Sequence, residues 1–182
     1  MKLLIVNDEV IAAKGVMTGI DWGNYGIDEV CAAYEAESAR QLLESIHFDI
    51  LLCDIEMPGE NGIELVRWIR KNSYEIEVIF LTCHADFEFA QEAIRLQCRN
   101  YILVPASYED IAENVFAVVQ QIEEKRRAKA KQQYGELWLE ERKKENEEEN
   151  TVNSTEKAVE NVKQYISRHL NDPEMTVNKI AL

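Results

Sequence analysis

The chain has 182 residues, 46% hydrophobic and 30% charged, and its formal net charge at pH 7 is −14. This composition is typical of a packed soluble domain, and the negative charge opposes direct binding to nucleic acid or anionic lipid. No apolar run approaches the roughly 18 residues that a membrane span needs. We therefore expect a cytoplasmic protein without a membrane helix or secretory signal. The four cysteines form no C-x-x-C pair, so we expect reduced thiols, most of them packed.

Strand-like apolar runs alternate with helix-like stretches from residue 1 to about residue 122. Lys2–Val6 predicts a strand and Val10–Ile20 a helix. Four more strand–helix pairs are expected at 28–34 with 37–46, 49–53 with 63–69, 78–81 with 87–96, and 101–103 with a helix from about residue 108. Strict alternation predicts an α/β fold, a five-stranded doubly wound parallel sheet, because each right-handed crossover packs a helix back onto the sheet. The runs 50–53 and 78–81 are apolar throughout, as strands buried on both faces should be.

Polar side chains follow several of these strands. Asn7, Asp8 and Glu9 follow the first, Asp54 ends the third and Thr82 follows the fourth. Ligands of such sheets bind at the carboxyl ends of the strands, near the point where strand order reverses. Like charges about 4 Å apart cost about 4 kcal/mol at an effective dielectric near 20, so a cation is expected, and Mg²⁺ suits these oxygen ligands better than Zn²⁺. Taken singly, each acidic residue could equally be a helix cap or a loop residue.

The segment from Asp54 to Gly62 reads D-I-E-M-P-G-E-N-G. Its Pro-Gly step predicts a tight turn that keeps the backbone near the carboxylate. Three more features accompany this segment: acidic residues after the first strand, Thr82 after the fourth, and an aromatic residue and a proline around the fifth. Taken together, the pattern resembles the receiver domain of two-component response regulators. The resemblance extends over residues 1–122.

The resemblance implies a role for individual residues. It implies that Asp54 is the phosphoacceptor, Asp8 a direct Mg²⁺ ligand, Glu56 a ligand through its main-chain carbonyl, Thr82 the hydroxyl that captures the phosphoryl group, and Tyr101 the aromatic switch. It also implies a flavodoxin-like fold, a sensor histidine kinase as partner, and a signalling role rather than an enzymatic one.

Two positions depart from the family pattern. Asn7 stands where the family usually has a second Asp, and we expect it to hold a metal-bound water. Val104 stands directly before Pro105, where the family has a Lys. Valine has neither charge nor donor, so a charge-assisted contact worth roughly 1.5 to 3 kcal/mol is lost. We expect phosphorylation, its coupling to the switch, or both to be weakened.

The chain beyond residue 122 is rich in Glu, Lys, Arg and Gln. The last helix carries an apolar stripe at Ile111, Val115, Val118 and Ile122 that should pack on the sheet. We expect this helix to continue for several turns, and a small apolar face around Trp138 should meet the receiver or a second subunit in a homodimer. A polar linker with a hinge is expected over 145–155, which closes the helical extension 123–155.

Residues 156–182 predict a new short helical tail, stopped at Asn171-Asp172-Pro173, and a further helix capped by Thr176. The pattern V-x-x-Y-I-x-x-H-L-x-D-P-x-x-T-V-x-x-I-A resembles the start of an AraC-type helix-turn-helix domain. The recognition helix is missing. The resemblance therefore implies a fragment of a longer regulator, which contacts DNA through the missing C-terminal domain and not through this fragment.

Three other functions compete with that of a phosphoryl-accepting receiver. A haloacid dehalogenase-type phosphatase expects D-x-D after its first strand, and a flavin binder expects a glycine-rich phosphate loop where Asn7, Asp8 and Glu9 would repel phosphate. The third is a degenerate receiver that acts as a phosphorylation-independent dimerisation or ligand-sensing module, and Val104 favours it.

Overall fold

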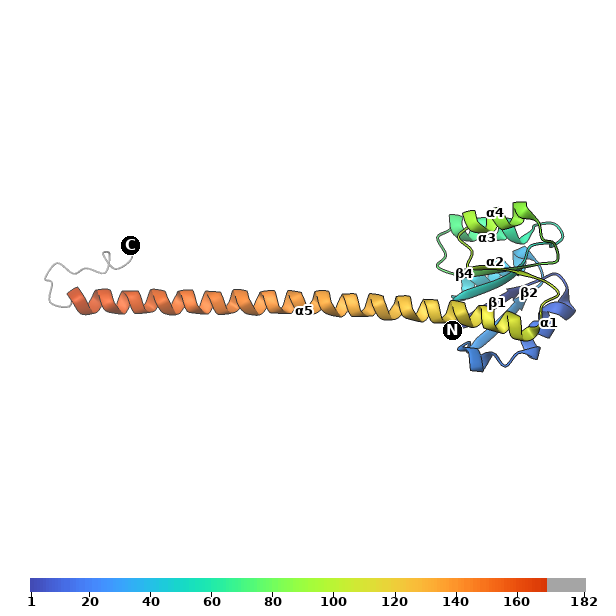
Figure 1. Cartoon of the computed structure of the whole chain (residues 1–182). Coiled ribbons are helices and arrows are strands. Elements are labelled where there is room, and N and C mark those ends of the chain that lie inside the picture. The colour runs from blue at the N-terminus through green and yellow to red at the C-terminus, as the bar shows by residue number, and fades with distance from the viewer. Residues whose placement is uncertain (170–182) are drawn as a thin grey trace. The chain divides into compact units, whose positions relative to one another are not determined.

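The computed structural model describes the backbone of residues 1–169 (Figure 1). Side chains are described through residue 136 and, beyond it, at positions 138, 142, 143, 156–164, 167 and 168. Residues 1–125 form one compact unit, and the described residues from 126 onward belong to a second. Within the described part, no helix is both long and apolar enough to cross a membrane.

All predicted strands and helices of the first unit are present, with ends that differ from the predicted ones by at most two residues. The strands are β1 (Lys2–Val6), β2 (Glu29–Ala33), β3 (Ile50–Asp54), β4 (Glu77–Thr82) and β5 (Asn100–Leu103). The helices are α1 (Val10–Gly19), α2 (Ala36–Ser45), α3 (Gly62–Lys71), α4 (Phe87–Arg95) and α5 (Tyr108–His169). A short 3₁₀ helix, η1 (Trp22–Tyr25), was not predicted. It buries Trp22, whose indole N–H donates to the Val16 carbonyl at 3.2 Å.

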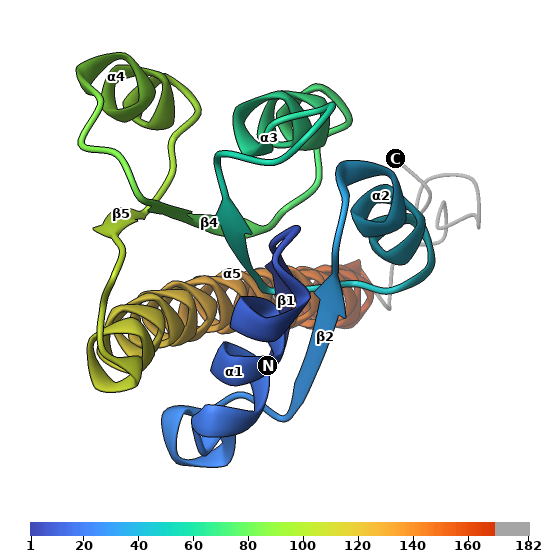
Figure 2. The same ribbon diagram turned by 90° about the vertical axis from the view of Figure 1, so that its right-hand side faces the viewer.

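The five strands form one parallel sheet in the order β2-β1-β3-β4-β5. Helices α1 and the first turns of α5 cover one face, and α2, α3 and α4 cover the other (Figure 2). This is the predicted doubly wound fold. Strand order reverses at β1, which lies between β2 and β3, so the ends of β1 and β3 lie side by side where such folds bind ligands.

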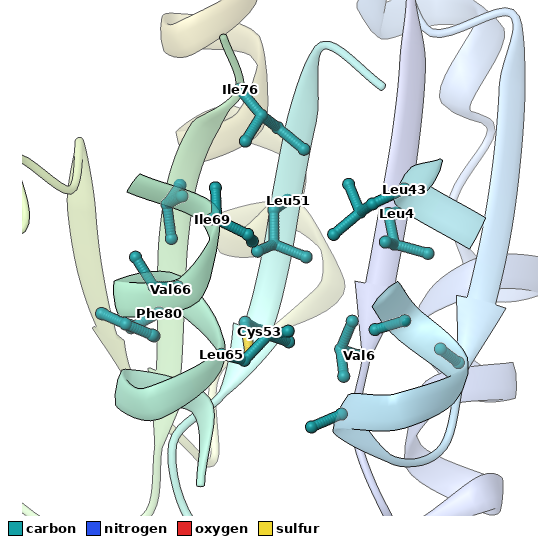
Figure 3. Close-up of a cluster of buried hydrophobic side chains, with 14 of the residues drawn as sticks. Leu4, Val6, Leu43, Leu51, Cys53, Leu65, Val66, Ile69, Ile76 and Phe80 are labelled. Atoms are coloured by element: carbon teal, nitrogen blue, oxygen red, sulfur yellow. The ribbon is translucent and has the colours of Figure 1, made fainter. Parts of the chain in front are cut away.

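Two apolar clusters, one on each face, hold the sheet between the helices. Leu51 and Cys53 of β3 point to the α2–α3–α4 side (Figure 3), whereas Ile50 and Leu52 point to the α1–α5 side. All four are 0% exposed. Because a fully buried side chain of this kind contributes about 1.5 to 3 kcal/mol, β3 is anchored firmly on both faces, and so is the carboxylate at its end.

Helix α5 differs from the prediction because it is continuous from Tyr108 to His169. The expected break over 145–155 is absent. No proline lies between Pro105 and Pro173, and the Asn, Ser and Thr of this stretch each disfavour a helix by at most about 0.7 kcal/mol relative to alanine. Gly135 also lies inside the helix. The predicted stop at 171–173 and the helix capped by Thr176 lie outside the described residues, and the domain boundaries at 122 and 155 stay predictions.

All four cysteines of the chain are free in the structure. Cys53 is buried, Cys31 and Cys98 are partly buried, and Cys83 is exposed.

Candidate functional site

Asp54 lies at the carboxyl end of β3 with both carboxylate oxygens engaged. The Asn7 amide nitrogen, at the end of β1, donates to Asp54 Oδ2 at 3.1 Å, and the Glu56 main-chain N–H donates to Oδ1 at 3.1 Å. The Asn7 side-chain oxygen accepts from the Glu9 main-chain N–H at 2.7 Å, which fixes the amide with its donor toward Asp54. The site therefore brings together residues from two neighbouring strand ends, as the sequence predicts.

Asn7 contacts the candidate acceptor directly. That Asn7 holds a metal-bound water stays a prediction, and in the structure its amide donates directly to Asp54. An aspartate in its place could not do so, because an ionised carboxylate has only acceptors. The substitution therefore replaces a repulsive neighbour of the carboxylate with a hydrogen-bond donor.

The charges around Asp54 are unfavourable to its ionised form. Burial is the largest cause that raises the pKa of Asp54, and the charges of Asp8 and Glu56 raise it further, although main-chain hydrogen bonds oppose the rise. Among the described side chains, the ion pairs include neither Asp8 nor Asp54. An added cation beside these two carboxylates would lower this electrostatic cost.

The residues at this site fit Mg²⁺ better than a metal that requires many protein ligands. Within the described chain, no group of three or more His, Cys, Asp or Glu side chains is arranged to hold a metal. Mg²⁺ typically keeps several waters and takes only one or two protein carboxylates. Asp8 and Asp54 could supply these carboxylates, and the Glu56 main-chain carbonyl a third oxygen, as the resemblance implies.

Glycines hold the loop after β3 close to the carboxylate. Gly59 has a φ of 80°, in the left-handed region that glycine adopts without strain. A Cβ atom built on Gly62 would lie 2.1 Å from the Asp54 carbonyl oxygen, so only glycine fits there. Asn61 caps α3 next to it: its side chain accepts from the Glu64 main-chain N–H at 2.9 Å, and the Glu64 side chain accepts from the Asn61 N–H at 3.1 Å.

Thr82, at the end of β4, is 0% exposed, and its hydroxyl contacts the next loop. It donates to the His84 carbonyl at 3.3 Å and accepts from the His84 main-chain N–H at 3.1 Å. The Tyr101 hydroxyl, from β5, donates to the same His84 carbonyl at 2.9 Å. The predicted phosphoryl-binding hydroxyl and the predicted aromatic switch therefore share one main-chain acceptor.

Sequence reasoning missed a contact that joins the β3–α3 and β4–α4 loops. The Glu56 side chain bonds to His84 Nδ1 at 2.6 Å, and this contact raises the pKa of His84. A signal for it was available. Glu56 stands two residues after Asp54, and His84 two after Thr82, at the ends of neighbouring strands. The sequence indicated Glu56 for its main-chain carbonyl alone.

Val104 supplies no polar group to the site. Its main-chain N–H donates to the Thr82 carbonyl at 2.9 Å, which fixes this residue beside β4. Its half-buried side chain packs against the apolar cluster under α1 and α5. The fifth strand end thus contributes neither a cation nor a hydrogen-bond donor from a side chain.

The strands follow the order 2-1-3-4-5, and a half-buried carboxylate lies where this order reverses. An acidic side chain lies near it, and a buried threonine ends the next strand. These features define a CheY-like receiver fold. Residues 3–116 match the response regulator receiver domain, and the chain belongs to this family. It is therefore a signalling domain and not an enzyme, which removes the phosphatase and flavin-binding alternatives.

Relatives of known sequence are transcriptional regulators. The chain is 26% identical over 121 residues to the uncharacterized transcriptional regulatory protein YesN of Bacillus subtilis, an alignment covering 66% of this chain and 33% of YesN. It is 28% identical over 110 residues to the transcriptional regulatory protein HptR of Staphylococcus aureus, covering 60% of this chain and 43% of HptR. The chain thus spans less than half the length of these curated relatives.

Solved structures show the same fold. The receiver domain of AraT, a response regulator from Geobacillus stearothermophilus, matches with a TM-score of 0.63 and 33% identity, covering 69% of this chain and 97% of that one. A two-component transcriptional regulator AraC from Clostridium phytofermentans matches with a TM-score of 0.63 and 28% identity, covering 68% and 96%.

Proposed function

We propose that this chain is the phosphoryl-accepting receiver of a response regulator, with Asp54 as the acceptor. The observation that carries the proposal is the environment of Asp54. Its carboxylate is oriented by hydrogen bonds from two loops, and it lies near the acidic Asp8, which forms no ion pair among the described side chains. Both features suit a carboxylate that reacts with a dianionic phosphoryl group in the presence of Mg²⁺.

In this proposal one Asp54 oxygen attacks phosphorus while the bond from phosphorus to the leaving group breaks, and the leaving group departs with the electron pair. The Asn7 amide and the Glu56 main-chain N–H hold the carboxylate in a fixed orientation during attack. Mg²⁺, when bound, supplies positive charge that offsets the charge developing on the phosphoryl oxygens. The product adds about −1.5 to −2 charges to the site.

Thr82 links this chemistry to the surface. To donate to a phosphoryl oxygen, its hydroxyl must leave the His84 carbonyl, which it contacts at 3.3 Å. The Tyr101 hydroxyl would then be left as the described side-chain donor to that carbonyl. The position of the β4–α4 loop and the orientation of Tyr101 should therefore change together.

The wider role is part of the same proposal. The phosphodonor is a sensor histidine kinase in the cytoplasm, and the output is transcription, through an AraC-type DNA-binding domain that would begin near residue 156. Two observations support this. The curated relatives are named as transcriptional regulatory proteins and are more than twice as long as the matched segment, and one solved relative is described as a transcriptional regulator AraC.

Intact-mass measurement after incubation with Mg²⁺ and acetyl phosphate tests the acceptor. The parent chain should gain the mass of one phosphoryl group, and the gain should disappear without Mg²⁺. Asp54→Asn keeps the shape of the side chain but removes the nucleophilic oxygen pair, so it should gain nothing. An adduct that persists in Asp54→Asn, or no adduct in the parent at any donor concentration, would contradict the proposal.

A second candidate function is the degenerate receiver, which acts without phosphorylation. The packing of the half-buried Val104 side chain against the apolar cluster under α1 and α5 favours it, because an apolar contact gives this position a role that needs no phosphoryl group. The two candidates differ in what a lysine at position 104 would do.

A further inference from the structure

The part of α5 beyond Lys125 carries large apolar side chains that nothing in the described chain covers. Tyr134, Trp138, Val159 and Val162 are 75%, 54%, 50% and 41% exposed, and they are all the large exposed hydrophobics among the described side chains of this part. The Arg142 guanidinium lies 4.9 Å from the Trp138 ring centroid, so one face of this indole is partly shielded.

These four residues share one seven-residue repeat. Trp138 and Val159 are 21 positions apart, Tyr134 and Val162 are 28 apart, and the remaining spacings are 4 and 3. In a single heptad frame, Trp138 and Val159 therefore occupy position a, and Tyr134 and Val162 occupy position d. On a straight helix a strict heptad repeat drifts by about 20° per heptad. The four side chains form one continuous seam only if the helix winds with a left-handed supercoil around a partner.

We propose that residues 126–169 form a parallel, in-register coiled coil with the same segment of a second copy of this chain. The partner must be a helix of comparable length, and the other described helices have ten residues or fewer. A second copy provides such a helix with a matching repeat. The inference rests on the spacing of exposed residues and goes beyond the proposed function, because it does not require phosphorylation of Asp54.

The sequence favours parallel over antiparallel pairing. In the parallel register each of the four apolar residues meets its own copy. An antiparallel register that sets Trp138 against Val162 would instead set Val159 against Glu141, by count along the helix. In addition, parallel pairing brings position g of one helix near position e of the next heptad of the other. Lys144 and Glu149 occupy these positions and carry opposite charges.

The seam is interrupted by acidic residues, and this predicts a weak dimer. By count, five a and d positions lie between Trp138 and Val159: Glu141, Glu145 and Glu148 occupy the first three, and Val152 and Thr155 the other two. In a dimer these positions bring six carboxylates together, and like charges in the seam oppose pairing. Salt screens such repulsion. We therefore expect a reversible dimer that becomes tighter as ionic strength rises.

Sedimentation equilibrium of the 1–182 chain tests the seam with a matched pair of variants. Glu148→Leu, at position d, should lower the dimer Kd by about tenfold or more. Glu147→Leu changes charge and hydrophobicity equally at the neighbouring position c, and its Kd should stay within about twofold of the parent. Trp138→Ala should raise the Kd by about tenfold. Equal tightening in both Glu variants, or a parent that stays monomeric at all concentrations and salt levels, would overturn the proposal.

Disulfide trapping tests the orientation. In a Cys83→Ser background, Val162→Cys should cross-link two copies on oxidation, because position d side chains meet their own copies in a parallel pair. Lys157→Cys, at position f, should not. A dimer without Val162→Cys cross-linking would exclude the parallel register. Asp54→Asn should dimerise as the parent does, so failure of the phosphorylation proposal and failure of this one give different results.

Discussion

Replacing Val104 by lysine tests whether the fifth strand end has lost a cation or gained a packing role. The residue is fixed beside β4 by the hydrogen bond from its main-chain N–H to the Thr82 carbonyl, and Thr82 lies one strand away from Asp54. Neighbouring strands are about 4.8 Å apart. A lysine at position 104 could therefore extend across β4 toward the phosphoryl site.

The expected gain and cost differ enough to be measured. A charge-assisted contact contributes about 1.5 to 3 kcal/mol, and since about 1.4 kcal/mol is a factor of ten, phosphorylation should be roughly 10- to 150-fold faster. Val104 is only half-buried, and the lysine stem can cover much of the same apolar surface. The free energy of unfolding should therefore fall by less than about 1 kcal/mol.

The assay combines Asp54 phosphorylation by acetyl phosphate, followed by intact mass, with urea unfolding of the same variants. Val104→Met is the matched control, because it has a long unbranched side chain without a charge and should not speed the reaction. If Val104→Lys loses several kcal/mol of stability and reacts no faster, position 104 is an apolar packing site. The degenerate receiver would then be the better description.

Three further predictions concern the site and its supports. Ionised Asp54 is destabilising in its present surroundings, so Asp54→Asn should raise the melting temperature measured without Mg²⁺. The same variant should abolish the rise in melting temperature that Mg²⁺ gives the parent chain. An unchanged response to Mg²⁺ would mean that the metal binds elsewhere. Gly62→Ala should lower the free energy of unfolding, measured in urea, by about 3 kcal/mol, since the new Cβ would meet main-chain atoms of Asp54. Gly23→Ala is the control: its Cβ would lie 3.6 Å from the nearest atom, Asp21 Oδ1, so the free energy of unfolding should change by less than about 0.5 kcal/mol. The hydrogen bond from Arg99 is the main cause that lowers the pKa of Glu77 from 4.5 to about 2. The stability that this interaction contributes is therefore present above about pH 4.5 and is lost as the pH falls toward 2. Glu77→Gln should lower the free energy of unfolding by about 2 kcal/mol at pH 7 and by almost nothing near pH 2, and an equal loss at both pH values would refute this cause.

The fold could be predicted from the sequence because its signals are local and consistent. Uninterrupted apolar runs at 50–53 and 78–81 specify strands buried on both faces, and strict alternation with helices leaves few topologies. Asp54 and Asn7 could be placed together for the same reason, since the ends of parallel strands meet at one edge of the sheet.

Other features depend on the conformation of loops and could not be predicted in the same way. The contact between Glu56 and His84 joins two loops that are 28 residues apart, and no periodic pattern encodes it. The amide of Asn7 is turned toward Asp54 by the Glu9 main-chain N–H, which depends on the turn after β1. The uninterrupted α5 differs from the prediction because Asn, Ser and Thr disfavour a helix interior only weakly, and no proline breaks this stretch.

The structure separates two roles that a strand-five lysine would combine. The group that would help to bind the phosphoryl oxygens is missing, because position 104 is a valine, which packs against the apolar cluster under α1 and α5. In the proposed function, the route from the site to Tyr101 does not pass through this residue, because the Thr82 and Tyr101 hydroxyls share the His84 carbonyl as acceptor. The Glu56 side chain holds the same loop from the other side through His84 Nδ1. We therefore infer that the Val104 substitution slows entry into the phosphorylated state more than it weakens the response to that state. In that case a phosphate mimic such as beryllofluoride should shift the surroundings of Tyr101 in the parent chain even where phosphorylation by small donors is slow.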